Sequence, residues 1–367
     1  MAMRTLDWYI LKKFFLTFFL CMLLLTAVAV AVDSSERADD FLRAGFNTME
    51  LINNYYLGFV PWIWSLLFPL FVFIAVIYFT SRMASRSEVI AILSGGMSYN
   101  RFLLPFFIGG LFFAVLLWVG TRYWIPKANV IRSNFQAHYV DRTDPTKNRV
   151  LNNCFNCYYL RTDSNTFVSI REYDTSSRAA RGFSLNRIQN NRVVYNLRSE
   201  WMRWDTATNK WKLSNAAERV IDSMGETLRR YPELNIDLDL RPAELKKDLY
   251  IKDKLTTAEL VAFIRQEELR GTEGLNVLKV ERYRRTATPA TVLLLTMIGA
   301  IVASRKTRGG SGVHMAIGIA IAALFILSDR FSTTFAVKGN FSPFIAAWLP
   351  NVVFTGVAYW LYRQTPK

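Results

Sequence analysis

The sequence predicts an α-helical polytopic membrane protein with six transmembrane helices and an inserted all-β domain. Of its 367 residues, 51% are hydrophobic and 14% are aromatic. The apolar residues form uninterrupted runs, and a helix that crosses a bilayer needs about 20 such residues at about 1.5 Å each. Three runs precede a central segment that has none, and three follow it. The predicted spans are residues 14–32, 59–80, 102–124, 289–304, 313–331 and 344–362.

Residues 1–125 form the predicted first membrane domain. The first run lacks a small-residue cleavage site at its end, which favours a retained span over a cleaved signal peptide. The loop 33–58 is acidic, which fits the outer side of a membrane. Tryptophans at the start of the second run and at the end of the third are typical of membrane interfaces.

The segment between the second and third spans predicts a short exposed helix within residues 83–95. Ser85 and Glu88 have the spacing of a capping box, in which each side chain bonds the other residue's backbone N–H. Four apolar residues follow, and Gly95-Gly96 can adopt the left-handed conformation that ends helices. A capped, partly apolar helix between two spans is expected to dock onto another molecule.

Residues 126–254 predict a β domain of the size of a sandwich or jelly roll. Segments such as 166–170, 192–197, 210–213 and 234–240 alternate apolar and polar residues, as half-buried strands do. Asp205 to Asn209 is predicted to be a hairpin turn. Cys154 and Cys157 form a single CxxC, for which we expect a local disulfide; a metal site or reduced thiols remain the alternatives.

Residues 255–285 predict a connecting helix, and residues 286–367 the last three spans. Thr256 and Glu259 have capping-box spacing, and Gly271 and Gly274 are expected to end that helix.

The distribution of basic residues predicts that both termini are cytoplasmic and that the β domain lies outside the cytoplasm. Lys and Arg are concentrated in the segments that this layout places inside. These residues are Arg4, Lys12, Lys13, Arg82, Arg86, Arg101, Arg305, Lys306, Arg308, Arg363 and Lys367. The net charge of +16 is therefore attributed to membrane topology and anionic lipids, and no nucleic-acid partner is expected.

No motif in the chain predicts a catalytic residue or a metal ligand. The glycine-rich segment 305–312 lacks the GxxxxGK[ST] pattern that binds nucleotide phosphates. Two histidines are too few for a histidine-rich metal site, and HExxH and GxSxG are absent. No cofactor is expected on this chain, and energy for transport would come from a partner. The alternative is a membrane-embedded enzyme that modifies envelope lipids.

Two stretches resemble one known family. RSEVIAILSGGMSYNRFLLP (residues 86–105) is similar to the cytoplasmic helix of LptF/LptG, the permease subunits of the lipopolysaccharide-export ABC transporter. The segment 284–289, the RKTRGG loop and PFIAAWLPN (residues 343–351) resemble the same family. The resemblance implies an inner-membrane permease with a periplasmic jelly-roll domain, leaning to the LptG type. It also implies four partners: a cytoplasmic ABC ATPase dimer that binds the ATP, a homologous six-span permease, a periplasmic jelly-roll bridge protein and lipopolysaccharide.

The resemblance implies that Glu88 is the acidic residue of the coupling helix, which pairs with a basic residue of the ATPase. Ser85 would cap that helix, and Ile92, one turn after Glu88, would enter the same groove. A purely structural role for Glu88, as part of the capping box, is compatible with docking.

Basic residues at the outer membrane edge are candidates for binding lipopolysaccharide phosphates, because Arg pairs bidentately with phosphate. Ordinary snorkelling to phospholipid headgroups is the alternative for each of them. The candidates are Arg37, Arg43, Arg122, Lys127, Arg132, Arg282 and Arg285. Asp329, at the end of the fifth span, is a lateral-gate candidate, although a local ion pair with Arg330 is the simpler expectation.

Overall fold

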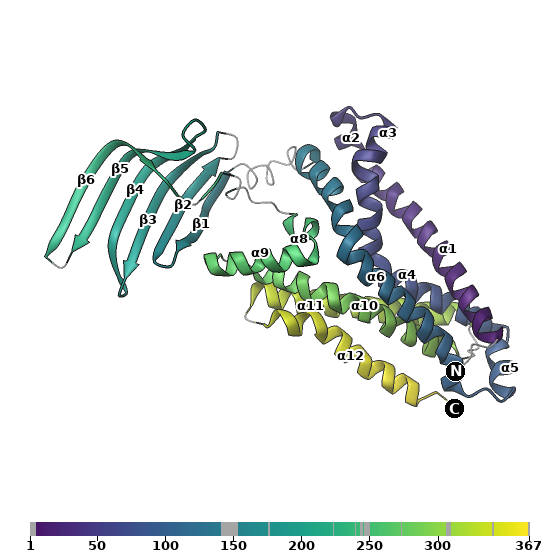
Figure 1. Ribbon diagram of the computed structural model, residues 1–367. Coiled ribbons are helices and arrows are strands. Elements are labelled where there is room, and N and C mark those ends of the chain that lie inside the picture. Colours follow the sequence, from purple (N-terminus) through teal and green to yellow (C-terminus); the bar gives the residue numbers. More distant parts are fainter. Residues whose placement is uncertain are drawn as a thin grey trace. The chain divides into compact units, whose positions relative to one another are not determined.

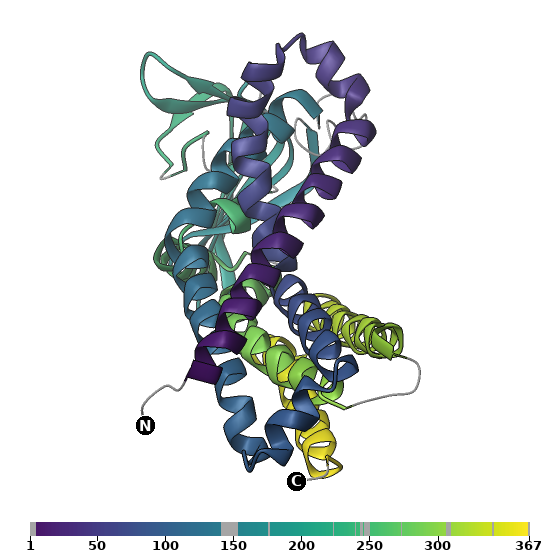
Figure 2. The same cartoon turned by 90° about the vertical axis from the view of Figure 1, so that its right-hand side faces the viewer.

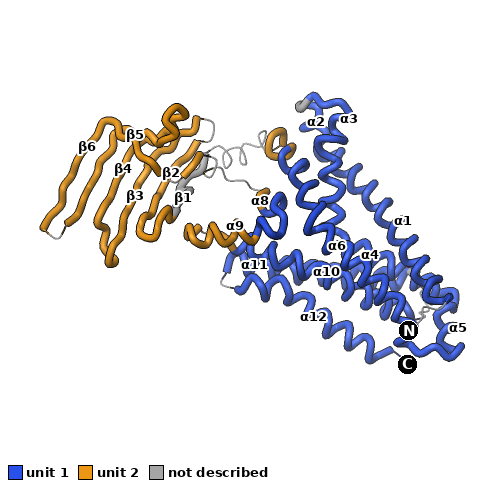
Figure 3. The backbone as a smooth tube through the Cα atoms, viewed as in Figure 1, with its two compact units in different colours: residues 1–134, 252–260, 276–367 blue, residues 135–251, 261–275 orange. Residues whose placement is uncertain are grey.

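The computed structural model forms two compact units (Figure 3). It describes residues 5–140, 153–174, 177–222, 224–238, 240–242, 245, 250–272, 274–305, 310–339 and 341–365, without the side chains of 43–44, 153–160 and 310–311. Unit 1 comprises Met1–Asn134, Lys252–Leu260 and Asn276–Lys367, and unit 2 comprises Phe135–Ile251 and Val261–Leu275.

Unit 1 is a helical bundle (Figure 1). Six of its helices are long: α1 (Thr5–Glu36), α4 (Leu57–Ser85), α6 (Tyr99–Phe135), α10 (Asn276–Ala303), α11 (Gly310–Lys338) and α12 (Pro343–Arg363). The other described helices are shorter: α2 (Ala38–Ala44), α3 (Thr48–Leu51), the π-helices η1 (Ile52–Tyr56) and η2 (Gln136–Val140), α5 (Glu88–Ser94), α8 (Ile251–Lys254) and α9 (Thr257–Arg270). Of these, η2 and most of α9 belong to unit 2.

The six predicted spans are confirmed as helices that are long and apolar enough to cross a membrane. Each helix extends beyond its apolar run, because the backbone hydrogen bonds of a helix can continue through polar residues that follow or precede the run. Thus α6 continues through Pro126 to Phe135, and the boundary predicted at residue 126 lies inside a helix. Likewise α10 begins at Asn276, so the last ten residues assigned to a connecting helix belong to the fourth span.

The bundle core is aromatic where α1, α4 and α6 meet. The Phe14 ring lies 5.7 Å from that of Phe79 and 5.2 Å from that of Phe113, and all three side chains are buried. Burial differs strongly among the spans: 61% of the apolar window of α10 is buried, against 6% for α1. Since α10 also packs against α4, α11 and α12, it is the central helix, whereas α1 lies along the outside of the bundle (Figure 2).

Gly58 allows α4 and α6 to approach closely. A Cβ atom at this position would lie 2.5 Å from the Ala128 carbonyl oxygen and 2.6 Å from the Arg132 nitrogen, both of which are backbone atoms. We therefore expect Gly58→Ala to destabilise the protein by about 1–3 kcal/mol, the usual cost of overpacking, measured by thermal unfolding in detergent. The control is Gly356→Ala in α12, where a Cβ meets nothing within 4 Å; equal stability of the two variants would contradict the prediction.

The described residues of unit 2 contain one antiparallel sheet of six strands. They are β1 (Asn153–Asp163), β2 (Thr166–Asp174), β3 (Ala179–Gln189), β4 (Arg192–Asp205), β5 (Lys210–Asp222) and β6 (Gly225–Ile236). The strands pair in sequential order, which confirms the inserted β domain. Among the described residues the order is that of an up-and-down meander, without the crossovers of a Greek-key jelly roll. The alternating segments predicted at 166–170, 192–197 and 210–213 all lie within strands.

One face of the sheet carries the core of unit 2. Phe183, Leu197, Met202 and Leu213 are buried there, together with Trp211, which is fully buried. The indole Nε1–H of Trp211 donates to the carbonyl oxygen of Leu240 at 2.7 Å, so the segment after β6 folds back over this face. The alternation seen in the sequence thus results from a sheet that is apolar on one face only.

The predicted turns and the second predicted helix cap are confirmed. Asp205 accepts the backbone N–H of Ala207 at 2.9 Å, and this bond lowers the pKa of its carboxyl below the ordinary value. In α9, the Glu259 carboxylate accepts the N–H of Thr256 at 2.8 Å, while the Thr256 hydroxyl accepts the N–H of Glu259 at 3.4 Å. Gly271, with φ of 70°, follows the last residue of α9.

Candidate functional site

The predicted docking helix is α5, a seven-residue helix at the end of the bundle where α1 begins and α12 ends, called here the terminal end (Figures 1 and 2). Val89 is buried and anchors α5 to the bundle core. Gly96, with φ of 87°, ends the helix in the left-handed conformation that was expected of it. The helix is shorter than the predicted range 83–95, because α4 continues to Ser85.

The capping box expected between Ser85 and Glu88 is absent from the structure. Ser85 is the last residue of α4, and its hydroxyl donates to the carbonyl of Arg82 at 2.9 Å, back along its own helix. The residue that precedes α5 is Ser87, in a left-handed conformation (φ 61°) and without a side-chain cap bond. The prediction was wrong because a left-handed residue separates α4 from α5, so Ser85 and Glu88 do not belong to one helix start.

Glu88 instead contacts α1. Its Oε2 accepts a hydrogen bond from the Tyr9 hydroxyl at 3.1 Å and lies 3.3 Å from the Lys13 Nζ. Lys13 and Tyr9 are one turn apart on α1, and Lys13 also donates to the Tyr9 hydroxyl. Both carboxylate and ammonium remain partly exposed, with side-chain exposures of 27% and 34%. The sequence marked Lys13 only as a basic flank of the first span; nothing in it indicated the contact with residue 88.

The exposed surface of α5 differs from the one expected. Ile92 is partly buried and packs against the bundle core, so it faces inwards. Ile90 is 48% exposed, and Ala91 and Ser94 are exposed beside it. The large apolar residue that α5 exposes is therefore Ile90, which the i, i+4 argument from Glu88 did not select. Arg82 and Arg86 are also exposed on this side of the junction.

The remaining helices meet at the terminal end through polar contacts. Asp7, 2% exposed, forms a 2.5 Å ion pair with Arg101 at the start of α6. The hydroxyls of Tyr99 and Ser304 are 3.0 Å apart, which joins α6 to α10. Arg305 donates to the carbonyl of Leu361 at 3.1 Å. The structure beside α5 is thus held together by polar contacts, which link four of the six long helices: α1, α6, α10 and α12.

The opposite end of the bundle holds the predicted phosphate-binding residues, and there Arg37 is engaged internally. Its Nε lies 2.9 Å from Oδ1 of Asp33, one turn earlier in the chain. The same oxygen accepts the Tyr55 hydroxyl at 3.0 Å, and the Arg37 guanidinium lies 5.7 Å from the Tyr55 ring. This cluster joins the end of α1 to η1.

Arg132 and Arg285 are both buried, and both hold α8. Arg285 donates to the carbonyl oxygens of Lys252 at 2.7 Å and Leu255 at 2.9 Å. Arg132 stacks 4.1 Å over the Trp62 ring and lies 3.7 Å from the Asp253 carboxylate. Burial raises the pKa of Asp253, against the opposing effect of neighbouring cations. These two arginines therefore have a structural role, and their binding of phosphate stays a prediction.

Three other candidates lie nearer the surface. Lys127 and Arg122 are exposed, and the Arg122 guanidinium lies 5.4 Å from the Trp118 ring. Arg282 is half-buried, 5.3 Å from the Tyr283 ring. The side chain of Arg43 lies outside the described residues. Stacking of Arg on aromatic rings is also what snorkelling at a membrane interface produces, so the two alternatives remain open for these residues.

Asp329 pairs with Arg284 rather than with its neighbour Arg330. The Arg284 Nη2 donates to the Asp329 carboxylate and, at 3.2 Å, to the Thr333 hydroxyl. The prediction of a local Asp329–Arg330 pair was wrong, because adjacent residues on a helix point in different directions. The Arg284–Asp329 pair lines a cavity of about 220 Å³ between α4, α10 and α11, whose other walls include Leu66 and Phe325.

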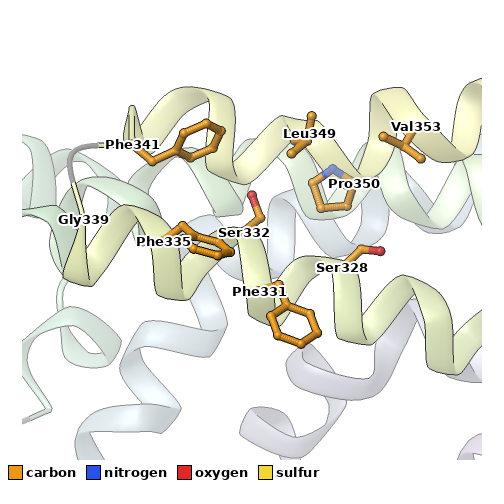
Figure 4. Close-up of a pocket in the computed structure, with 9 residues that line it drawn as sticks. All are labelled: Ser328, Phe331, Ser332, Phe335, Gly339, Phe341, Leu349, Pro350 and Val353. Carbon is orange, nitrogen blue, oxygen red and sulfur yellow. The ribbon is translucent and has the colours of Figure 1, made fainter.

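A second hollow of about 530 Å³ lies between α11 and α12, near the end opposite α5. Figure 4 shows Phe331 and Phe335 on α11 and Leu349 and Pro350 on α12 around it. The hydroxyl of Ser332 crosses between the helices, donating to the carbonyl of Ala346 at 2.7 Å. The lining is apolar, which suits a surface within a membrane.

The side chains of Cys154 and Cys157 lie outside the described residues, so their disulfide stays a prediction. Their backbone belongs to β1, where Cys154 is paired with Tyr173 of β2. Among the described residues, no group of three or more His, Cys, Asp or Glu side chains is placed to hold a metal ion.

Comparison with known proteins identifies the family. The sequence matches the family described as "Lipopolysaccharide export system permease LptF/LptG" over residues 8–364, nearly the whole chain. No curated protein sequence matches it significantly. The family is one of transport permeases, so the alternative of a lipid-modifying enzyme loses its support. The description covers both members, and the leaning to the LptG type stays a prediction. The chain belongs to the LptF/LptG family of lipopolysaccharide export permeases and is a multi-pass protein of the inner membrane.

Proposed function

We propose that this chain is one permease subunit of an ABC transporter that extracts lipopolysaccharide from the inner membrane and passes it to a periplasmic bridge. The observation that carries the proposal is α5. It is a short helix between two spans, anchored by Val89 and with Ile90 and part of Glu88 exposed. A chain without a nucleotide-binding motif needs an outside source of energy, and such a helix is a suitable contact for a cytoplasmic ATPase dimer that binds the ATP.

The orientation follows from charge. Lys12, Arg82, Arg86 and Arg363 lie at the terminal end with α5, and an excess of Lys and Arg marks the cytoplasmic side of membrane proteins. We therefore propose that both termini lie in the cytoplasm and the β domain in the periplasm. A homologous six-span permease would pair with this chain, and the poorly buried α1 provides apolar surface for that contact or for lipid.

The β domain would join the periplasmic bridge protein by strand addition, in which a partner strand extends a sheet through backbone hydrogen bonds. Among the described strands, β1 pairs only with β2 and β6 only with β5, so both are edge strands. β6 is exposed along most of its length and contains Pro232, a residue that sheets tolerate at edges.

The test is purification of the tagged chain from its native membrane, followed by transport assays in vesicles. We expect an ATP-binding subunit and a second six-span protein to co-purify, and ATP to drive release of lipopolysaccharide to a jelly-roll acceptor. Recovery of a monomer that chemically modifies envelope lipids would reject the permease.

Glu88→Ala is expected to lower the lipopolysaccharide released per ATP hydrolysed by about tenfold or more, because losing one interfacial charge costs about 2 kcal/mol. The protein should remain inserted, since Glu88 is partly exposed. Asp39→Ala, which removes an exposed carboxylate from α2 at the other end of the bundle, is the matched control. Normal assembly and normal coupling in Glu88→Ala would refute the docking role.

A further inference from the structure

We propose that Lys13 and Tyr9 are positioning residues that connect the docking helix to the first span. They bind the Glu88 carboxylate, so that a partner acting on α5 also acts on α1. This inference rests on the proposed coupling role of Glu88 and adds the route by which that role reaches the membrane.

The contacts from α1 reach only one described oxygen of the Glu88 carboxylate, and this supports the route. Both the Tyr9 hydroxyl and the Lys13 ammonium contact Oε2, at 3.1 and 3.3 Å. A carboxylate accepts bonds at both oxygens, and Arg commonly binds one with a fork of two donors. A basic group of a docking partner can therefore bind Glu88 while Lys13 keeps its contact. The carboxylate then bridges two cations, one on the partner and one on α1.

The packing of α1 makes it the span that such a bridge can move. Its buried side chains are confined to its first turns, up to Phe18, and to Asp33; from Phe19 to Val32 none is buried. In contrast, α10 is buried along most of its apolar window. The middle of α1 still contacts α4, through the hydrogen bond of 2.8 Å from the Trp64 indole to the Thr26 hydroxyl, but without buried side chains it is held less firmly than a central helix that is buried along its length.

The first turns of α1 are held by two ion pairs of different character. Asp7 and Arg101 form the more buried pair, with side-chain exposures of 3% and 12%, and link α1 to α6. Lys13 and Glu88 are about one-third exposed and link α1 to α5. The buried pair serves as a fixed pivot, because separating it would leave charges buried. The exposed pair is the one that a partner can reach.

The experiment compares Lys13→Met, Tyr9→Phe and Lys13→Arg in the complete transporter, reconstituted in vesicles with its ATPase and second permease. The matched control is Lys12→Met, which removes the same charge from the exposed neighbouring position. ATP hydrolysis and lipopolysaccharide release to an acceptor are measured on the same sample. We expect Lys13→Met to hydrolyse ATP but to release about fivefold to tenfold less lipid per ATP, a typical size for coupling between sites. Lys13→Arg should restore the ratio, and Tyr9→Phe should have a smaller effect.

The outcomes separate this inference from the function on which it rests. If Glu88→Ala uncouples transport while Lys13→Met behaves like Lys12→Met, the route through α1 is refuted and the docking role stands. If neither variant changes lipid release per ATP, both the docking role of Glu88 and the route through α1 are refuted, whereas absence of ATP-driven release from the wild-type complex would refute the permease itself. Where Lys13→Met inserts poorly, the charge reversal Lys13→Glu with Glu88→Lys must restore insertion relative to Lys13→Glu alone; failure to restore it overturns the link.

Discussion

Arg285→Met is expected to lower the free energy of unfolding by about 3 kcal/mol or more, because hydrogen bonds to a buried charge are among the strongest in proteins. The guanidinium donates to the carbonyls of Lys252 and Leu255 and lies 3.5 Å from the Glu281 carboxylate. Methionine fills similar volume but leaves these acceptors without their donor. The measurement is thermal unfolding in detergent, together with protease sensitivity around α8.

Two variants decide whether the loss reflects charge or hydrogen-bond geometry. Arg285→Lys keeps the charge without the planar fork that reaches two carbonyls, and should recover only part of the stability. Arg282→Met removes a half-buried guanidinium that stacks on Tyr283, and should cost much less. If Arg285→Met unfolds like the wild-type protein but binds lipopolysaccharide less tightly, the structural role is refuted in favour of phosphate binding.

Trp211→Ala is expected to destabilise the β domain by about 3–5 kcal/mol, the usual cost of truncating a buried Trp. The side chain is fully buried, contacts the Trp204 ring at 5.0 Å and satisfies the Leu240 carbonyl. Near-ultraviolet circular dichroism and limited proteolysis of the full chain should report loss of packing in this domain.

Trp211→Phe keeps most of the apolar area but loses the indole N–H, so it isolates the hydrogen bond, worth about 1–3 kcal/mol when a buried acceptor is left unsatisfied. Trp201→Ala, at a 46% exposed position on β4, is the surface control. A Trp211→Ala protein as resistant to protease as Trp201→Ala would show that the domain core lies elsewhere.

The sequence was sufficient for the spans and most strands because their signals are local. The length of a hydrophobic run indicates whether a helix can span the bilayer. Alternation of apolar and polar residues indicates a strand in a sheet with one buried face. Helix ends were less predictable: α6 passes through Pro126, and Gly58 of α4 lies against its backbone at Ala128 and Arg132, a contact between distant segments that no local pattern signals. The meander order of the sheet depends on pairings between strands, which no local pattern specifies.

The site was predictable as a segment but not as a set of contacts. Gly95-Gly96 and the apolar residues before it located α5. Because Ser87 is in a left-handed conformation, Ser85 does not cap α5. The partners of Glu88 are Lys13 and Tyr9 on α1, 75 and 79 residues earlier in the chain. The roles of Arg132 and Arg285 likewise depend on α8, whose four residues carry no signal of their own. Such partners are fixed by tertiary packing, which only the folded chain reveals.

The polar contacts at the terminal end also constrain the order in which the chain can assemble. Asp7 and Arg101 both belong to the first half, so their pair can form once α6 has been inserted. Tyr99 must wait for Ser304, 205 residues later in synthesis, and the Tyr362 hydroxyl donates to Asn100, 262 residues earlier in the chain. In the proposed orientation, the whole β domain crosses the membrane between these events. When the first three spans enter the bilayer, the start of α6 therefore still lacks its hydrogen-bond partners from the second half of the chain. The last of these contacts forms when the final turn of α12 packs against the bundle.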